Sequence, residues 1–173
     1  MSKIIIAIDN GLFGCACKSE EDKEPILTDT PIVPVKVGKK FRNKFDVKEM
    51  VKILEQYSQI YTSSIKDPSN ILAVIEQTIP MPGIASMATK SIGLGEGLWI
   101  GILATLKIPC MELSIRKWQS HFGIWGKGKE TKHEAYLLAS RLFPRCRLKT
   151  ERGRLLDGRC DALLMAEYAR REL

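Results

Sequence analysis

Four acidic side chains stand at positions where carboxylates are costly unless something binds them. Asp157 and Asp161 lie four residues apart in a segment of helical periodicity, which places both on one face beside apolar residues. Like charges at this spacing are unfavourable by about 0.2–0.5 kcal/mol even on an exposed helix, and burial adds to the cost. Asp9 and Glu76 each end an apolar run typical of a buried strand. A divalent cation held between these four carboxylates would compensate their repulsion.

The chemistry of these donors indicates which cation and which reaction to expect. Carboxylate oxygens without paired His or Cys favour Mg²⁺, with Mn²⁺ as a substitute, over zinc. Two such ions suit in-line cleavage of a phosphodiester. Taken singly, each acid also has an ordinary explanation: Asp9 as a turn residue, Glu76 as a strand end at the surface, and Asp157 as a helix N-cap. The interpretation therefore depends on the set, and Asp161 is the hardest member to explain otherwise.

Strands and helices must bring these acids together. Strands are expected at residues 3–9, 12–17, 30–37, 71–75 and 108–113. Helices are expected at residues 46–61, 84–107, 114–121, 129–143 and 156–171. Asn10 and Gly11 suit a two-residue hairpin turn, and Pro31 and Pro34 favour an edge position for the third strand. The order predicts a mixed α/β fold that opens with antiparallel strands.

A stripe of small residues follows the second helix. Gly93, Gly97 and Gly101 recur every fourth residue, so they share one helix face. This spacing favours close packing against the sheet or against a partner.

Composition and charge limit the remaining possibilities. The 173 residues predict a single domain, residues 1–173, with five cysteines that match neither a disulfide framework nor a zinc site. We expect no membrane span and no signal peptide, and therefore a cytoplasmic protein, in the bacterial host cytoplasm if a phage encodes it. Residues 114–173 carry 14 basic and 7 acidic side chains, whereas residues 1–113 carry 13 of each. Such one-sided positive charge favours a nucleic acid partner over a merely solvated face. The side chains expected to contact DNA are Lys127, Lys129, Lys132, Arg145, Arg147, Lys149, Arg152 and Arg154.

Three motifs together resemble the RuvC family of Holliday junction resolvases, in its compact phage-type branch. They are IAIDNG around Asp9, AVIEQ around Glu76 and DGRCDALLMA from Asp157, and residues 95–113, 114–123 and 131–144 are similar as well. The resemblance implies a ribonuclease H-like fold with a mixed five-stranded sheet, an antiparallel opening meander and flanking helices. It also implies metal-binding roles for Asp9, Glu76 and Asp161, with Asp157 as a fourth acid and Lys132 at the scissile phosphate. The family often places the paired acid or His where this chain has Gly158.

The resemblance further implies a homodimer that cuts a four-way DNA junction in two symmetric places. The glycine stripe with Trp99 would then serve as the interface, although packing within the chain explains the stripe equally well. Ile79 and Met81 are candidates for insertion between bases at the junction centre. The alternatives are another ribonuclease H-like nuclease that cuts hybrids or flaps, and a junction-binding protein without catalysis. A two-domain ATPase of the sugar-kinase or actin type would need about twice this length.

Overall fold

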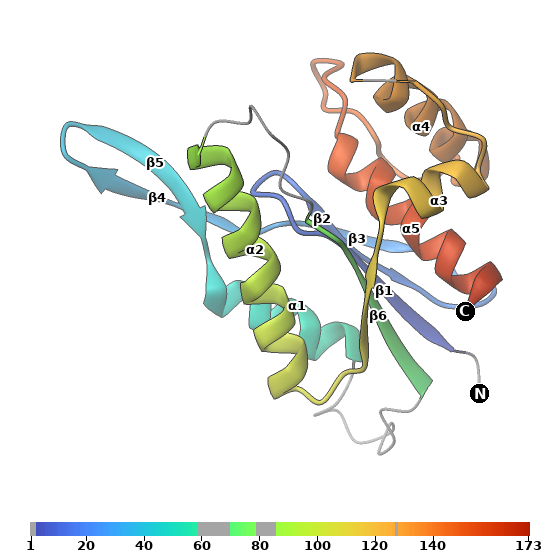
Figure 1. Ribbon diagram of the computed structural model, residues 1–173, viewed down its shortest axis with the longest axis horizontal. Helices are drawn as coiled ribbons and strands as arrows, with labels where there is room; N and C mark the ends of the chain where they lie inside the picture. The colour runs from blue at the N-terminus through green and yellow to red at the C-terminus, as the bar shows by residue number, and fades with distance from the viewer. Residues whose placement is uncertain (1–2, 59–69, 79–85, 127) are drawn as a thin grey trace.

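A mixed five-stranded sheet forms the centre of the computed structural model, which describes residues 3–58, 70–78, 86–126 and 128–173 (Figure 1). Its strands are β1 (Ile4–Asp9), β2 (Cys15–Ser19), β3 (Ile26–Asp29), β6 (Ile71–Glu76) and β7 (Cys110–Leu113). They lie in the order β3-β2-β1-β6-β7. The first three strands pair antiparallel, whereas β6 and β7 continue the sheet parallel to β1. The predicted mixed sheet with an antiparallel opening is confirmed.

Helices cover both faces of this sheet. The helices are α1 (Val47–Ser58), α2 (Ser86–Thr105), α3 (Ile115–His121), α4 (Lys129–Leu142) and α5 (Asp157–Glu172). Helices α1 and α2 pack on one face, and α3, α4 and α5 lie on the other (Figure 1). Their bounds agree with the predicted helices to within one or two residues where the structure describes them. The predicted cap of α1 is also present, because the Asp46 carboxylate accepts a hydrogen bond from the Glu49 amide at 3.2 Å.

The two-sided cover explains the continuous apolar run of β1. Ile4, Ile6 and Ile8 are buried beneath α1 and α2, whereas Ile5 and Ala7 are buried beneath α5. Side chains alternate between the faces of a strand, so a strand covered on both sides needs apolar residues at every position.

The hairpin between β1 and β2 has a longer turn than predicted. Asp9 pairs with Cys15, so residues 10–14 form the connection. The Gly14 amide donates to the Gly11 carbonyl at 3.0 Å, which closes a turn beside Asp9. A Cβ atom on Gly14 would lie 2.2 Å from the Asp9 carbonyl oxygen, so only glycine fits there. The predicted two-residue turn is wrong because the chain folds back over the end of β1.

The prediction for residues 30–37 is also wrong. The third strand of the sheet is β3, and the chain then leaves the sheet at Pro31 to form a separate two-stranded ribbon. This ribbon consists of β4 (Ile32–Val37) and β5 (Lys40–Phe45), and β5 was not predicted. Proline lacks the amide proton that a ladder within the main sheet would require, which favours departure at this point.

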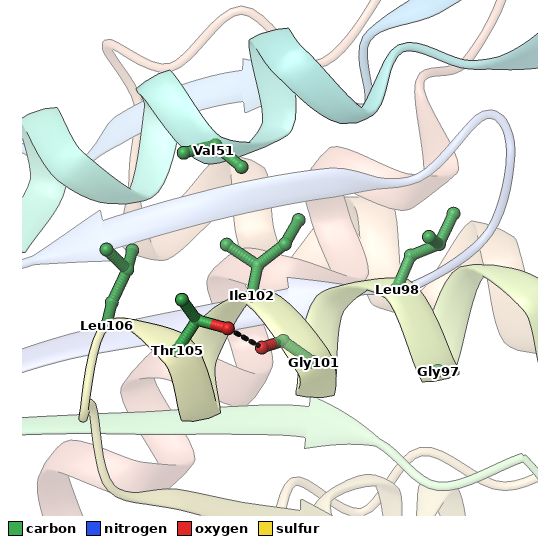
Figure 2. Close-up of a pocket in the computed structure, with 7 residues that line it drawn as sticks. All are labelled: Val51, Gly97, Leu98, Gly101, Ile102, Thr105 and Leu106. Carbon is green, nitrogen blue, oxygen red and sulfur yellow. Dashed lines mark hydrogen bonds between the residues drawn. The ribbon is translucent and has the colours of Figure 1, made fainter.

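The glycine stripe of α2 faces open space. A Cβ atom on Gly93, Gly97 or Gly101 would meet no atom of another described residue within 4 Å. Gly97 and Gly101 border a shallow groove of about 370 Å³ between α2 and Val51 of α1 (Figure 2). Packing of these glycines within the chain is therefore wrong as an explanation of the stripe. Trp99 is fully buried, so it cannot serve an interface as predicted.

All five cysteines are free thiols, and three of them are buried. Within the described part of the chain, no helix has both the length and the apolar character that crossing a bilayer requires.

Candidate active site

Parallel pairing brings Asp9 and Glu76 to the same edge of the sheet. Strands β1 and β6 are neighbours in a register that pairs Ile8 with Ile75, and each strand ends at its acid one residue later. The pKa of Glu76 is raised to about 8, chiefly by burial and then by the charge of Asp9. The two carboxylates thus interact directly.

Helix α5 carries the other two acids to this edge. Asp157 is its first residue, and Asp161 lies one turn further on. Between them, Gly158 lies so close to the end of β1 that a Cβ atom there would be 2.8 Å from Asp9 Oδ2 and 2.7 Å from the Cα atom of Gly14. No side chain fits at position 158, which accounts for the acid standing at 157 in this chain.

Burial and mutual repulsion raise the pKa values of Asp9, Glu76 and Asp161. Burial raises the pKa of Asp161 well above its usual range, and the charges of Asp9, Glu76 and Asp157 raise it further. Burial also raises the pKa of Asp9, although the Gly11 amide, which donates to Asp9 Oδ1 at 3.0 Å, opposes the shift. We call Asp9, Glu76, Asp157 and Asp161 the acidic cluster. Its members influence one another strongly enough that they cannot all be ionised cheaply without a cation.

Lys132 of α4 lies at the edge of the acidic cluster. Its ammonium group forms a hydrogen-bonded ion pair with Asp157. The pKa of Lys132 is raised by this bond and, more weakly, by the charges of Asp161 and Asp9. The lysine side chain is 57% exposed, so it can also reach a bound substrate.

The carboxylate ligands of the acidic cluster suit a hard divalent cation, but their side chains are not positioned to hold one. Among the residues that the structure describes, no three His, Cys, Asp or Glu side chains stand in a geometry that would hold a metal ion. The carboxylates of Glu76 and Asp161 form no hydrogen bond or ion pair with any described residue, which leaves their oxygens available as ligands. Holding one ion would therefore require these side chains to move closer together.

Two further residues fix the backbone around Glu76. The Asn10 side-chain amide donates to the Glu76 carbonyl at 2.7 Å and to Thr78 Oγ1 at 3.3 Å. Glu96 of α2 accepts a hydrogen bond from the Thr78 amide at 3.0 Å. From the sequence, Asn10 was predicted only as a turn residue, and Glu96 had no predicted role. A lone acid within the apolar helix was the available signal for Glu96.

Most of the predicted DNA contacts lie on α4 and on the connection between α4 and α5, residues 143–156. Lys129 is exposed at the start of α4. Arg145 pairs with Glu24 at 3.2 Å, and Arg147 pairs with Glu151 at 3.5 Å. In that connection Lys149 packs over the Tyr136 ring, while Arg152 and Arg154 are exposed.

Three predicted contacts cannot be located. Lys127, Ile79 and Met81 lie outside the described residues. Their proposed contacts with DNA remain predictions from the sequence.

Comparison with known proteins relies on the fold, because the sequence itself finds no match. No protein-family model matches the chain, and no curated protein matches its sequence. RuvC from T. thermophilus in complex with a Holliday junction substrate matches with a TM-score of 0.57 and 12% identity, covering 98% of this chain and 96% of that one. The chain has the RuvC fold. The predicted ribonuclease H-like fold is confirmed.

Two further solved structures are similar over most of the chain. A Thermus thermophilus RuvC structure has a TM-score of 0.48 and 10% identity, covering 98% of this chain and 96% of that chain. The yeast mitochondrial Holliday junction resolvase Ydc2 has a TM-score of 0.43 and 15% identity, covering 98% of this chain and 78% of its own.

Proposed function

We propose that the protein is a Holliday junction resolvase, a structure-selective endonuclease that cuts four-way or branched DNA by metal-dependent hydrolysis. The acidic cluster carries this proposal. It gathers Asp9, Glu76, Asp157 and Asp161 from three elements at one edge of a RuvC fold, and Lys132 lies beside it. The solved RuvC with this fold holds a Holliday junction substrate, which supports the same class of substrate here.

The catalytic roles follow from the position of each group. Asp9, Glu76 and Asp161 would hold the divalent cation, with Asp157 as a fourth oxygen donor. Bound Mg²⁺, or Mn²⁺ in its place, would supply an activated water and would offset the charge on the scissile phosphate. At neutral pH without a cation, Glu76 holds a proton on its carboxyl, and that proton must leave before the carboxylate can act as a ligand.

Residues around the acidic cluster orient its members. Asn10 and Glu96 hold the chain at Glu76 and Thr78, so the carboxyl group of Glu76 starts from a fixed backbone. Lys132 restrains Asp157 and offers a positive charge to a phosphate that approaches from solvent. Such fixed groups act most strongly when they need no reorganisation during the reaction.

The proposal includes a homodimer, because two symmetric cuts require two active sites related by a twofold axis. The open glycine stripe of α2 is the surface we expect at the dimer interface. We further propose membership of the phage-type branch of resolvases and action in the cytoplasm, where the DNA substrate would be.

A cleavage panel tests the function. The protein would be incubated with Mg²⁺ and a four-way junction, a three-way junction, a flap, a duplex or an RNA:DNA hybrid. We expect paired symmetric cuts in the four-way junction and little cutting of the duplex. Preferential cutting of the hybrid would refute the resolvase proposal in favour of another ribonuclease H-like activity.

Asp161→Asn separates catalysis from binding in the same assay. We expect the variant to lose Mg²⁺-dependent cleavage while it binds the junction as tightly as the wild type. Asp22→Asn is a matched control, because Asp22 is exposed between β2 and β3 and its φ of 59° suits asparagine. Full cleavage by Asp161→Asn would show that the wrong acids have been chosen. Junction binding without cleavage by the wild type would support a non-catalytic protein.

A further inference from the structure

The β4–β5 ribbon extends away from the body of the protein (Figure 1). Its two strands pair from Ile32 with Phe45 at the base to Val37 with Lys40 at the tip. Gly38, with a φ of 62°, occupies the turn at the tip. At about 3.4 Å per residue, the ribbon reaches about 17 Å beyond its base.

Positive charge is concentrated on this ribbon. Five basic residues and no acid occur in residues 32–45, namely Lys36, Lys39, Lys40, Arg42 and Lys44. None of these five cations forms an ion pair with any residue in the described part of the chain. Because side chains alternate along a strand, Lys40, Arg42 and Lys44 share one face at intervals of about 7 Å. A row of unpaired cations on a projecting ribbon fits a polyanion with regularly repeated charges.

Apolar side chains on the ribbon are also uncovered. Phe41 is 71% exposed near the tip, and Val33 and Val37 are also exposed. A two-stranded ribbon gains little stability on its own, and exposed apolar groups of this size favour contact with a ligand. Phe41 lies on the face opposite Lys40, Arg42 and Lys44, because successive side chains of a strand point to opposite faces, and its register partner Lys36 shares its face.

The base of the ribbon is attached beside the acidic cluster. Phe45 is buried and packs so close to Gly95 of α2 that a Cβ atom there would be 2.8 Å from the Phe45 ring. The same Cβ atom would be 2.2 Å from the carbonyl oxygen of Asn10, the residue that follows Asp9. The Asp46 amide donates a hydrogen bond of 2.9 Å to the Pro31 carbonyl, which joins the two ends of the ribbon at its base. The base of the ribbon therefore lies close to the end of β1, next to Asp9 of the acidic cluster.

We propose that the β4–β5 ribbon binds a duplex arm of the DNA substrate, with Lys40, Arg42 and Lys44 on its phosphates. This inference rests on the proposed function, because it assigns a partner contact to the same site. The DNA major groove is about 12 Å wide and admits a two-stranded ribbon. A ribbon that stands edge-on in the groove would present the cation row to one sugar–phosphate wall and Phe41, on its other face, to the opposite wall. A second copy of this chain fits less well, because two ribbons of five positive charges each would repel one another.

The salt dependence of binding tests this contact. The dissociation constant for a four-way junction and for a plain duplex would be measured over a range of salt concentrations. We would compare Lys40→Gln/Lys44→Gln with the control Lys3→Gln/Lys107→Gln, which removes the same charge ahead of the central strand β1 and ahead of the edge strand β7. Each lost phosphate contact lowers the slope of log K against log salt by about 0.9. A fourfold rise in salt should therefore weaken the ribbon variant about tenfold less than the wild type.

Two single variants give independent readings. Arg42→Gln should lower the slope by about 0.9 on its own. Phe41→Ser should weaken duplex binding several-fold without any change in slope, since phenylalanine carries no charge. Circular dichroism would confirm that each variant is folded.

An unchanged slope in the ribbon variants, or an equal decrease in the control, would overturn the ribbon proposal. If the wild type still cut the junction, the proposed function would remain intact. Conversely, a ribbon-dependent slope in a protein that cuts no junction would sustain the ribbon proposal and refute the resolvase. Conversion of a dimer to a monomer by Phe41→Ser, measured by sedimentation, would assign the ribbon to a protein interface and reject the duplex contact.

Discussion

Replacing Glu76 with glutamine should stabilise the metal-free protein at alkaline pH. The pKa of Glu76 is raised from 4.5 to about 8, so the folded state binds this proton more tightly than the unfolded state does. The free energy of unfolding must then fall as pH rises from about 4.5 through about 8, and the loss is complete above that range. Glutamine is nearly isosteric and cannot ionise, so the variant should lack this part of the pH dependence.

The magnitude follows from the size of the shift. The interval between the pKa values of 4.5 and about 8 corresponds to about 5 kcal/mol at about 1.4 kcal/mol per unit. Glu76 is partly exposed, so solvent reduces the cost and we expect a few kcal/mol. The raised pKa values of Asp9 and Asp161 act in the same direction, so some pH dependence should remain in the variant.

Chemical denaturation in EDTA at several pH values measures the effect. Glu112→Gln is a suitable control, because Glu112 is an exposed residue of β7 whose register partner is Ile75 of β6. Repeating the series with excess Mg²⁺ adds a second reading. The wild type should gain about 2.7 kcal/mol at a hundredfold excess over its dissociation constant, and the variant should gain less.

The opposite outcome would refute the reasoning. If Glu76→Gln left the pH dependence of unfolding as it is in the wild type, Glu76 would not be a crowded carboxyl. The same conclusion would follow if the Glu112 control showed an equal gain in stability. Either result would remove the electrostatic argument for a metal at this edge.

Two other substitutions test the geometry of the acidic cluster. Gly158→Ala should destabilise the fold by about 1–3 kcal/mol and slow cleavage more than junction binding, because its Cβ would lie 2.8 Å from Asp9 Oδ2. Denaturation midpoints and single-turnover rates check this. Gln56→Ala is the control, expected to change stability by less than about 0.5 kcal/mol because Gln56 is exposed on α1. Equal rates in the two variants would contradict the close approach. Lys132→Gln should slow cleavage about a hundredfold and change stability by less than about 1 kcal/mol, since its ion pair with Asp157 is exposed. Lys52→Gln is the matched control, because it removes another exposed ion pair, with Glu49 on α1. A large stability loss with normal cleavage would make Lys132 a structural residue.

The four acids could be predicted from the sequence because apolar runs and helical spacing can be recognised within short segments. The run before Asp9 is apolar at every position, which predicts a strand covered on both faces and therefore a central place in the sheet. Asp161 stands on the apolar side of a helix, which is unusual for a charged residue without a partner. The residues that orient Glu76 were harder to predict, because Asn10 and Glu96 act through hydrogen bonds to residues distant in sequence, and only the isolated charge of Glu96 in an apolar helix gave a local signal.

The ribbon escaped prediction for two reasons. When basic and acidic residues are counted over residues 1–113, the five positive charges of the ribbon are offset by the acids of residues 20–29, so this part of the chain appears neutral. Its first strand was assigned to the main sheet, because nothing local distinguishes an edge strand from a separate ribbon once prolines are present. Only the pairing of Ile32 with Phe45, seen in the structure, distinguishes a separate ribbon from an edge strand of the main sheet.

The central position of α5 has a consequence for biosynthesis. Its side chains complete the core on one face of β1, and Asp161 is separated from Asp9 by 152 positions. Contacts between such distant segments form late and slowly, since a long loop must close first. A ribosome must therefore translate α5 before the acidic cluster can assemble. Under the proposed function, the unfinished polypeptide could not cut nucleic acid while it is still being made.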